Sequence, residues 1–211
     1  RWRAGGGKVH AWVAAESLYS MDGDRAPLDD LAALANEQDA FVIVDEAHAV
    51  GVFGPEGRGL AAHLDGRENV VVLRTCGKAL GVEGALLCLP RLFRDFLVNR
   101  GRGFIFSTAP SPLMARAVGE ALRILADEPE RREALQQRVR LAEQGRGETG
   151  VPYSGLQIIP VILGDGARTM RVAAMLQASG YDVRGIRPPT VPPGTSPLRI
   201  SLNDLYELIE K

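Results

Sequence analysis

Lys78 is the residue of this sequence that is best placed for covalent chemistry. It stands in a glycine-flanked loop, residues 74–81, between a β-branched run at residues 69–73 and an apolar run at residues 84–90. Both runs have the length and the bounding residues of buried strands. A lysine amine can condense with a carbonyl, and the commonest cofactor that offers it one is pyridoxal phosphate. Taken alone, however, a lysine is more often a surface charge.

Pyridoxal phosphate makes three physical demands that other residues of the chain could meet. Its pyridine nitrogen must stay protonated, which calls for a buried carboxylate such as Asp45 at the end of an apolar run. Its ring oxygen needs a hydrogen-bond donor, and His48 follows three residues later. Its phosphate needs hydroxyls and amides, and Ser20, Thr75 and Thr108 offer hydroxyls.

Each of these residues also has a purely structural interpretation. Asp45 could mark the exit of a strand into solvent, and His48 could be a satisfied structural histidine. Ser20 precedes a Met-Asp-Gly turn, whose own chemistry would explain it equally well. Thr75 could only brace the glycine turn that follows it. The residue types alone therefore leave both interpretations open.

A mostly parallel sheet flanked by helices is the framework expected to position these residues. Apolar runs predict strands at residues 8–15, 41–44, 69–73 and 84–90. After Pro27, apolar residues at helical spacing predict a helix packed on the sheet. Its expected apolar face comprises Leu28, Leu31, Leu34 and Ala35. This alternation is typical of an α/β layer, in which ligands bind beyond the carboxyl ends of the strands. The residues that fall at or just after such ends are Ser20, Asp45, His48 and Lys78.

A second, smaller unit is expected at the C-terminal end. Ser111 and Pro112 form a helix start, and an apolar stripe follows it. The stripe comprises Met114, Val118, Leu122 and Leu125. Pro129 should open another helix, whose buried side would hold Leu135, Val139 and Ala142, and residues 145–150 should form a linker or turn. The small unit should then contain a strand at 156–163, a helix at 167–179, a strand at 181–186, a proline-rich loop to Pro197 and a strand at 198–202.

Composition excludes several classes of protein. The chain has 211 residues, 45% apolar and 24% charged, which is ordinary for a globular protein with a substantial core. Its 25 basic and 26 acidic residues give no reason to expect nucleic acid or a membrane surface as a partner. Two cysteines without disulfide or zinc spacing favour the cytoplasm. No membrane-spanning run or signal peptide is seen, and the start at Arg1 suggests a fragment.

Four segments occur in the order and approximate spacing of one enzyme family. They are residues 16–24 (ESLYSMDGD), 45–51 (DEAHAVG), 54–59 (GPEGRG) and 75–81 (TCGKALG). On these segments the chain resembles the α-oxoamine synthases, which are pyridoxal-phosphate acyltransferases of the aminotransferase type I fold. The resemblance implies an α/β fold. Residues 1–126 would be the C-terminal half of the large cofactor-binding domain, and residues 127–211 a small α/β C-terminal domain.

The resemblance also implies roles for individual residues around the cofactor. Lys78 would be the Schiff-base lysine, Asp45 the partner of the pyridinium nitrogen, and His48 the donor to the phenolic oxygen. Ser20 and Thr75 would contact the cofactor, Thr75 through the phosphate.

Three more residues receive roles from the same resemblance. Arg187 would hold the amino acid's carboxylate, a task suited to the paired donors of a guanidinium. Thr190 would be a substrate contact in the same loop. Thr108 would reach the cofactor of a neighbouring subunit, because the family's active sites lie at a homodimer interface.

The loop at residues 186–195 (IRPPTVPPGT) implies a narrower reaction. It looks most like the members of the family that join L-alanine to a pimeloyl thioester, carried on coenzyme A or acyl carrier protein, in biotin synthesis. The freed Lys78 amine would remove the α-proton of alanine, and the β-keto acid would lose carbon dioxide. The alternatives are a glycine-using synthase of the same family and a non-catalytic partner or remnant subunit.

The sequence also departs from the family pattern. The family has a long N-terminal portion before the region matched here, with a glycine-rich phosphate loop and a histidine that stacks on the ring. His10 and His63 do not lie in that context, so neither role can be assigned. Cys76 stands where phenylalanine is common, and Pro197 where arginine is usual. We therefore expect the chain alone to bind cofactor weakly and to turn over little.

Overall fold

The computed structural model describes residues 10–149 and 155–202. These residues divide into two compact units, each described here by itself. The first contains residues 10–18 and 25–129, and the second contains residues 19–24, 130–149 and 155–202. The short segment at residues 19–24 thus belongs with the C-terminal part of the chain.

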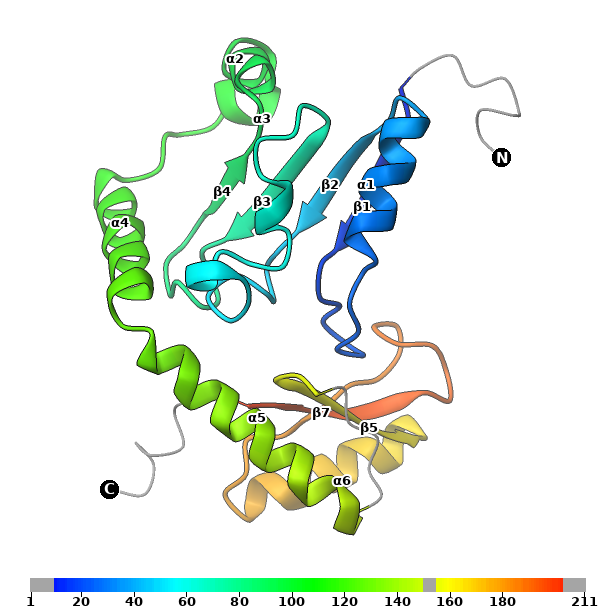
Figure 1. Ribbon diagram of the computed structural model, residues 1–211. Coiled ribbons are helices and arrows are strands. Elements are labelled where there is room, and N and C mark those ends of the chain that lie inside the picture. The colour runs from blue at the N-terminus through cyan, green and yellow to red at the C-terminus, as the bar shows by residue number, and fades with distance from the viewer. Residues whose placement is uncertain (1–9, 150–154, 203–211) are drawn as a thin grey trace. The chain divides into compact units, whose positions relative to one another are not determined.

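The first unit is built on a four-stranded sheet (Figure 1). Its strands are β1 (Trp12–Glu16), β2 (Phe41–Asp45), β3 (Val70–Thr75) and β4 (Ala85–Cys88), in that spatial order. β1, β2 and β3 run parallel, and β4 runs antiparallel to β3. Asp45 pairs in register with Glu16 on one side and Leu73 on the other, so the carboxyl ends of the parallel strands share one edge. The expected α/β class with a mostly parallel sheet is confirmed.

Helix α1 (Leu28–Glu37) covers one face of this sheet. Leu28, Ala32 and Ala35 are buried against valines of β2 and β3. Those valines are Val42, Val44, Val70 and Val72. The predicted apolar face was wrong at Leu34, which is 49% exposed, because the buried face follows the spacing i, i+4, i+7 from Leu28.

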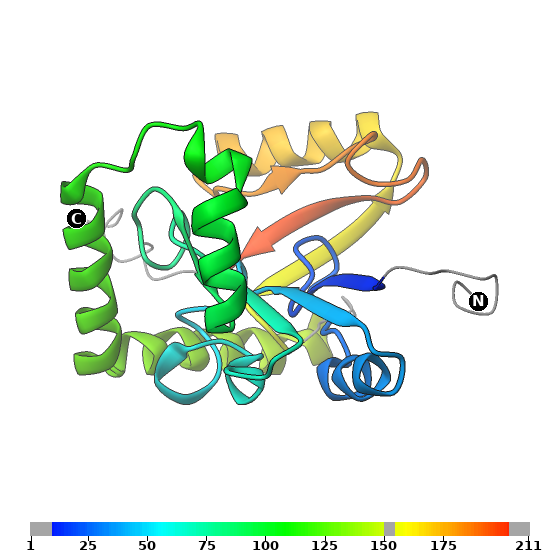
Figure 2. The same cartoon turned by 90° about the horizontal axis from the view of Figure 1, so that it is seen from above.

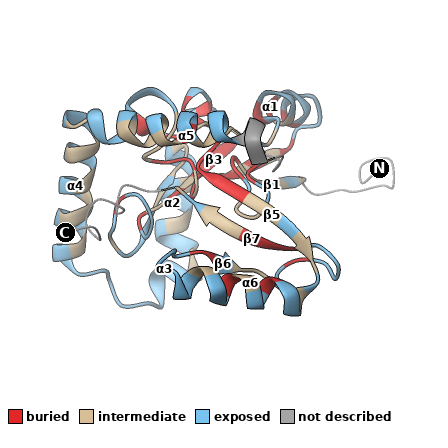
Figure 3. Cartoon of the chain, turned by 90° about the horizontal axis from the view of Figure 1, so that it is seen from below, coloured by how far each residue is buried: buried red, intermediate tan, exposed pale blue. Residues whose placement is uncertain are grey.

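The opposite face of the sheet carries an apolar hollow of about 650 Å³. It is lined by Trp12, Ile43, Val71, Leu73, Leu87, Leu89, Leu92, Phe93, Phe96 and Leu97. The last four belong to α2 (Arg91–Arg100), a helix that was not predicted from the sequence. A short helix, α3 (Arg102–Ile105), follows it. Leu92 is 79% exposed, and α2 buries no residue, so this face is incompletely covered (Figure 3).

A strand within residues 84–90 is confirmed by β4, but the expectation that this strand is buried was wrong. In β4, Leu87 is exposed, and β3 is its one neighbour in the described sheet. By contrast β3, between β2 and β4, buries Val70, Val71 and Val72. Figure 3 shows β3 largely in the colour of buried residues.

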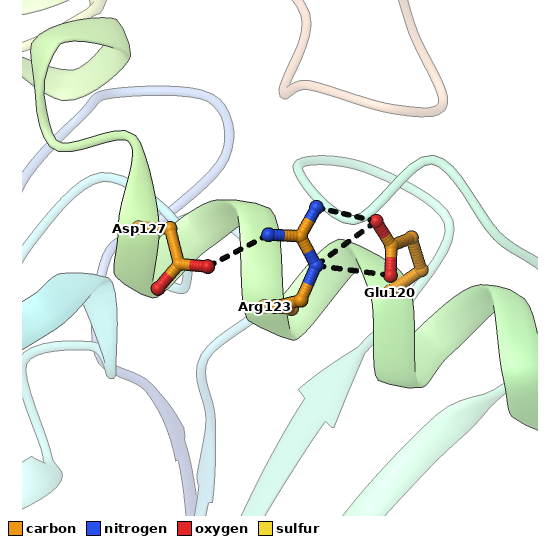
Figure 4. Close-up of polar contacts among 3 residues, drawn as sticks. All are labelled: Glu120, Arg123 and Asp127. Carbon is orange, nitrogen blue, oxygen red and sulfur yellow. Dashed lines mark hydrogen bonds and ion pairs between the residues drawn. The ribbon is translucent and has the colours of Figure 1, made fainter.

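Helix α4 (Pro112–Asp127) begins where the sequence predicted, with the Ser111 hydroxyl accepting the amide of Leu113 at 3.2 Å. None of its residues is fully buried: Met114, Val118 and Leu125 of the predicted apolar stripe are half-buried, and Leu122 is exposed. On its exposed surface Arg123 donates to Glu120 and Asp127 (Figure 4). Such solvated pairs at helical spacing add little to stability.

The second unit contains α5 (Glu130–Thr149), β5 (Ile158–Gly164), α6 (Gly166–Ala178), β6 (Arg184–Gly185) and β7 (Ser196–Ser201). β7 lies between β5 and β6, antiparallel to both. α6 packs on this sheet (Figure 2). The contact is made by Ala173, which is buried with Val183, just before β6, and with Leu198 of β7.

Several predicted boundaries in this unit were wrong. Residues 145–149 continue α5 and form no linker, because each glycine costs only about 1 kcal/mol within a helix of this length. β7 includes Pro197, which pairs with Ile162. β6 has two residues where six were predicted. Val139 is buried as predicted, whereas Leu135 and Ala142 are half-buried.

Candidate functional site

Asp45 is the last residue of β2 and is half-buried. Its Oδ1 accepts the amide of Ala47 at 2.8 Å, so the carboxylate is held at the point where the strand ends. Residues that alternate along a strand face opposite sides of the sheet, so Asp45 faces away from the core side that Val44 occupies. The carboxylate therefore lies at the edge where the parallel strands end, as the sequence predicted.

His48 lies in a tight turn that directly follows β2. The carbonyl of Glu46 accepts the amides of Ala49 and Val50, both at 2.9 Å. His48 is half-buried, and the turn keeps it three residues from Asp45 at the same end of the strand. A cofactor ring lying against Asp45 would thus have an imidazole within the same short segment.

The Lys78 loop follows β3, the neighbour of β2 in the sheet. The Cys76 amide donates to Gly84 at 2.9 Å, the Val82 amide donates to Cys76 at 2.9 Å, and the Gly81 amide donates to Lys78 at 3.0 Å. These bonds close the loop into a compact hairpin-like turn. The Lys78 side chain itself is exposed, so its amine is accessible to a ligand.

Thr75, the last residue of β3, fits a phosphate ligand. Its Oγ1 is buried and has no hydrogen-bond partner among the residues that the structure describes. A Cβ added at Gly77 or at Gly81 would meet no other heavy atom within 4 Å, so the backbone there is open to a ligand. A phosphate oxygen would give the orphaned hydroxyl an acceptor, and these residues therefore fit pyridoxal phosphate.

Two further observations concern the titratable side chains of the described residues. Cys76 is buried, and burial raises the pKa of its thiol, as is usual for a cysteine that only fills apolar space. Within residues 10–149 and 155–202, no group of histidine, cysteine, aspartate and glutamate side chains is arranged to hold a metal ion.

Ser20 belongs to the second unit, where its turn is fixed by an arginine. The Arg199 Nε donates to the carbonyl oxygen of Ser20 at 2.8 Å. Burial lowers the pKa of Arg199, whose side chain lies on β7. Arg199 was not among the site residues predicted from the sequence. The available signal was one arginine between Leu198 and Ile200 in an otherwise apolar strand.

Arg187 and Thr190 share one loop of the second unit, and the amide of Thr190 donates to the Arg187 carbonyl at 3.1 Å. Both side chains are exposed, and Arg187 lines an open depression of about 980 Å³ beside the start of α6. Thr108 is exposed in the first unit, in the segment between α3 and α4. The structure thus places Asp45, His48, Thr75 and Lys78 at one sheet edge, and Thr108 elsewhere in the same unit.

Comparison with known proteins identifies the family and the fold. The model of the family described as aminotransferase class I and II matches residues 3–210. The 8-amino-7-oxononanoate synthase of Chromobacterium violaceum is 44% identical over 200 residues, which cover 93% of this chain and 51% of that relative. The chain thus spans about half the length of the curated relatives it matches.

Two solved structures extend the comparison. Serine palmitoyltransferase from S. paucimobilis with a bound PLP–myriocin aldimine superposes with a TM-score of 0.84 at 29% identity, over 93% of this chain and 50% of that one. The 8-amino-7-oxononanoate synthase (bioF) from Francisella tularensis superposes with a TM-score of 0.79 at 25% identity, over 95% of this chain and 60% of that one. In the described part of the chain, no helix is long and apolar enough to cross a membrane.

Proposed function

Because the chain belongs to the aminotransferase class I and II family, we propose that it forms part of a pyridoxal-phosphate enzyme that joins L-alanine to a pimeloyl thioester. The product would be 8-amino-7-oxononanoate, formed with loss of carbon dioxide. The observation that carries the proposal is the position of the Asp45 carboxylate and the accessible Lys78 amine after adjacent parallel strands. The 44% identity to a curated 8-amino-7-oxononanoate synthase supports the choice of reaction.

Four residues of the first unit would hold the cofactor. Lys78 would carry it covalently, and Asp45 would stand beside its pyridine nitrogen. His48 would donate to its ring oxygen, and Thr75 would donate its unpartnered hydroxyl to the phosphate. In the second unit, Ser20 would add a further contact.

When bound, pyridoxal phosphate supplies an electron sink for the carbanion formed at the α-carbon of alanine. Asp45 would keep the proton on the pyridine nitrogen, because an opposite charge nearby favours the charged form. The Lys78 amine would remove the α-proton of alanine and later return a proton. Arg187 would orient the carboxylate of alanine through paired donors, and Thr190 would contact the substrate beside it.

The thioester could be carried by coenzyme A or by acyl carrier protein. A second candidate reaction uses another amino acid, because the chain also superposes on serine palmitoyltransferase with a TM-score of 0.84. The loop at residues 186–195 favours alanine over glycine or serine through its resemblance to the alanine-using members.

Trapping the cofactor on the chain tests the proposal directly. The sequence contains only three lysines, Lys8, Lys78 and Lys211, so a reduced adduct can be assigned without ambiguity. The 211-residue chain would be mixed with pyridoxal phosphate, reduced with borohydride and mapped by mass spectrometry. We expect the adduct on Lys78, at weak affinity, and a spectral change with L-alanine larger than with glycine or L-serine. Equal labelling of all three lysines would contradict a built cofactor site.

We further propose that the enzyme is a homodimer in which Thr108 reaches the cofactor of the partner subunit. The exposure of Thr108, in a segment without regular structure between α3 and α4, supports an intermolecular role. Replacing Thr108 by Ala should weaken cofactor binding in the dimer. Measured in dilute monomer, cofactor affinity should be the same with and without the substitution.

A further inference from the structure

Glu46, next to Asp45, is a buried carboxyl group for which the reaction provides no use. Its side chain is fully buried, and Oε1 accepts the amide of Ala61 at 2.8 Å, across fifteen residues of chain. The second oxygen, Oε2, has no partner among the described residues, and the fully buried Ser17 hydroxyl beside it also has none. A buried carboxyl group is costly, so its position requires an explanation.

Glu46 is fixed through its backbone as well as its side chain. Its amide donates to the carbonyl of Leu73 on β3 at 2.8 Å. Its carbonyl accepts the amides of Ala49 and Val50, which closes the turn that carries His48. The amide and the side chain of Glu46 therefore tie the end of β2 to β3 and to the segment at Ala61, while its carbonyl closes the local turn.

The Glu46 and Asp45 side chains lie on opposite sides of the chain at the end of β2. Val42, Val44 and Glu46 alternate along the chain with Ile43 and Asp45, so an anchored Glu46 on the core side directs Asp45 to the other side. A rotation that freed Glu46 would turn Asp45 toward the core. The bond to Ala61 opposes that rotation.

The loop between β2 and β3 is shaped to receive Glu46. A Cβ at Gly59 would lie 1.5 Å from Glu46 Oε2, so no residue larger than glycine fits there unless the carboxyl group moves. The same loop is held a second time by Arg74, which donates to the Arg58 carbonyl at 2.9 Å and to Asp65 at 3.0 Å. The loop is thus clamped from both β2 and β3.

We propose that Glu46 is a positioning residue for the cofactor site, which sets the orientation of Asp45 and His48 by anchoring the end of β2 to Ala61. The inference rests on the proposed function, since it concerns the binding of pyridoxal phosphate. The requirement is for the length and hydrogen-bonding shape of the side chain, and a negative charge at this position is not required.

Two substitutions separate length from charge. Glu46→Gln keeps the oxygen that accepts from Ala61, and its new amide group can donate to Ser17. Glu46→Asp keeps the charge but is one methylene too short to reach Ala61. Glu68→Gln, on the exposed turn before β3, is the matched control for loss of a carboxylate.

The measurements are the dissociation constant for pyridoxal phosphate, the fraction trapped on Lys78 and hydrogen exchange at the Ala61 amide. We expect Glu46→Asp to weaken cofactor binding roughly tenfold or more, as when a contact group shifts by about 1 Å, and to lose protection at Ala61. Glu46→Gln and Glu68→Gln should bind within about threefold of the wild type, since both retain the anchoring bond.

Two results would overturn the inference. In one, Glu46→Asp loses protection at Ala61 but binds pyridoxal phosphate as the wild type does, which would make the role structural only. In the other, Glu46→Gln binds as poorly as Glu46→Asp, which would show that the charge matters. Failure of the wild-type chain to bind pyridoxal phosphate at Lys78 would instead refute the proposed function, and this inference with it.

Discussion

The guanidinium of Arg199 and the backbone carbonyl of Ser20 are joined by a hydrogen bond of 2.8 Å, although 179 positions separate the two residues. The bond fixes residues 19–24 within the second unit. A segment that lies shortly after β1 in the sequence is therefore hydrogen-bonded to a residue of β7. Any ligand contact made by Ser20 depends on an arginine far from it in the chain.

Replacing Arg199 should loosen the segment at residues 19–24. Arg199→Ala removes one charge-assisted bond, and we expect a local loss of about 1 kcal/mol because the freed carbonyl can turn to water. Hydrogen exchange should accelerate at residues 19–24 with little change in α6. Arg184→Ala, an exposed arginine of the same sheet, serves as control. Unchanged exchange in the Arg199 variant would show that the bond does not hold the segment.

Replacing Lys78 should abolish specific attachment of pyridoxal phosphate. Lys78→Arg keeps the positive charge but has no amine that can condense with an aldehyde, so the borohydride-reduced adduct should disappear. The matched control is Lys8→Arg, which removes another of the three lysines. Persistence of a stoichiometric adduct in the Lys78 variant would assign the attachment to a different residue.

Replacing Asp45 should impair proton removal more than cofactor attachment. Asp45→Asn keeps an oxygen that accepts from Ala47 but removes the charge beside the pyridine nitrogen. We expect deuterium exchange at the α-carbon of L-alanine, followed by nuclear magnetic resonance, to slow by about 100-fold or more. Attachment at Lys78 should remain. Exchange at the wild-type rate would remove Asp45 from the proposed role.

The Glu46 carboxyl group should make stability depend on pH. Burial raises its pKa above the usual 4.5, while the Ala61 amide and the Arg74 charge oppose the rise. Between 4.5 and the raised folded value, the folded state binds more protons than the unfolded state, so the free energy of unfolding falls as pH rises.

Glu46→Gln should remove that fall, because an amide does not titrate. A tenfold difference between the acid dissociation constants of Glu46 in the folded and unfolded states changes the free energy of unfolding by about 1.4 kcal/mol. Urea unfolding of both proteins from pH 4.5 upward can measure a change of this size. The difference in the free energy of unfolding between wild type and variant should change with pH between 4.5 and the raised pKa, and should become constant above that pKa. A constant difference across the whole range would contradict a raised pKa.

The apolar hollow on the first sheet should bind a hydrophobic dye. Phe96 lines it and is exposed, so Phe96→Lys should reduce the fluorescence of bound anilinonaphthalene sulfonate and raise solubility. Leu141→Lys, at an exposed position on α5, should leave the fluorescence unchanged. Equal effects of the two substitutions would locate the dye elsewhere.

The parallel strands could be predicted from sequence because local patterns determine them. The run from Phe41 to Val44 is continuously apolar, which predicts a strand, and the polar residues that end it mark the site. The prediction of a helix start at Ser111 and Pro112 also used only neighbouring residues, and α4 confirms it. For the same reason Asp45, His48 and Lys78 could be placed at strand ends in advance.

The rest depended on contacts between distant residues. Leu87 looks like a core residue in its own segment, yet its exposure is decided by the strands and helices packed beside β4. Arg199 is singled out by its hydrogen bond to Ser20, 179 positions away, and Glu46 by its hydrogen bond to Ala61. Neither bond can be read from the local sequence. α2 was not predicted, although Leu92, Phe93, Phe96 and Leu97 recur at helical spacing, and these four side chains line the hollow.

The apolar hollow makes protein concentration a variable in every binding measurement on this chain. Two copies that bury these faces against each other would be favoured by mass action as concentration rises. An affinity for pyridoxal phosphate measured at high concentration would then describe an associated form, and one measured at high dilution would describe the single chain. A titration series over a wide range of chain concentrations therefore has to precede any comparison between variants.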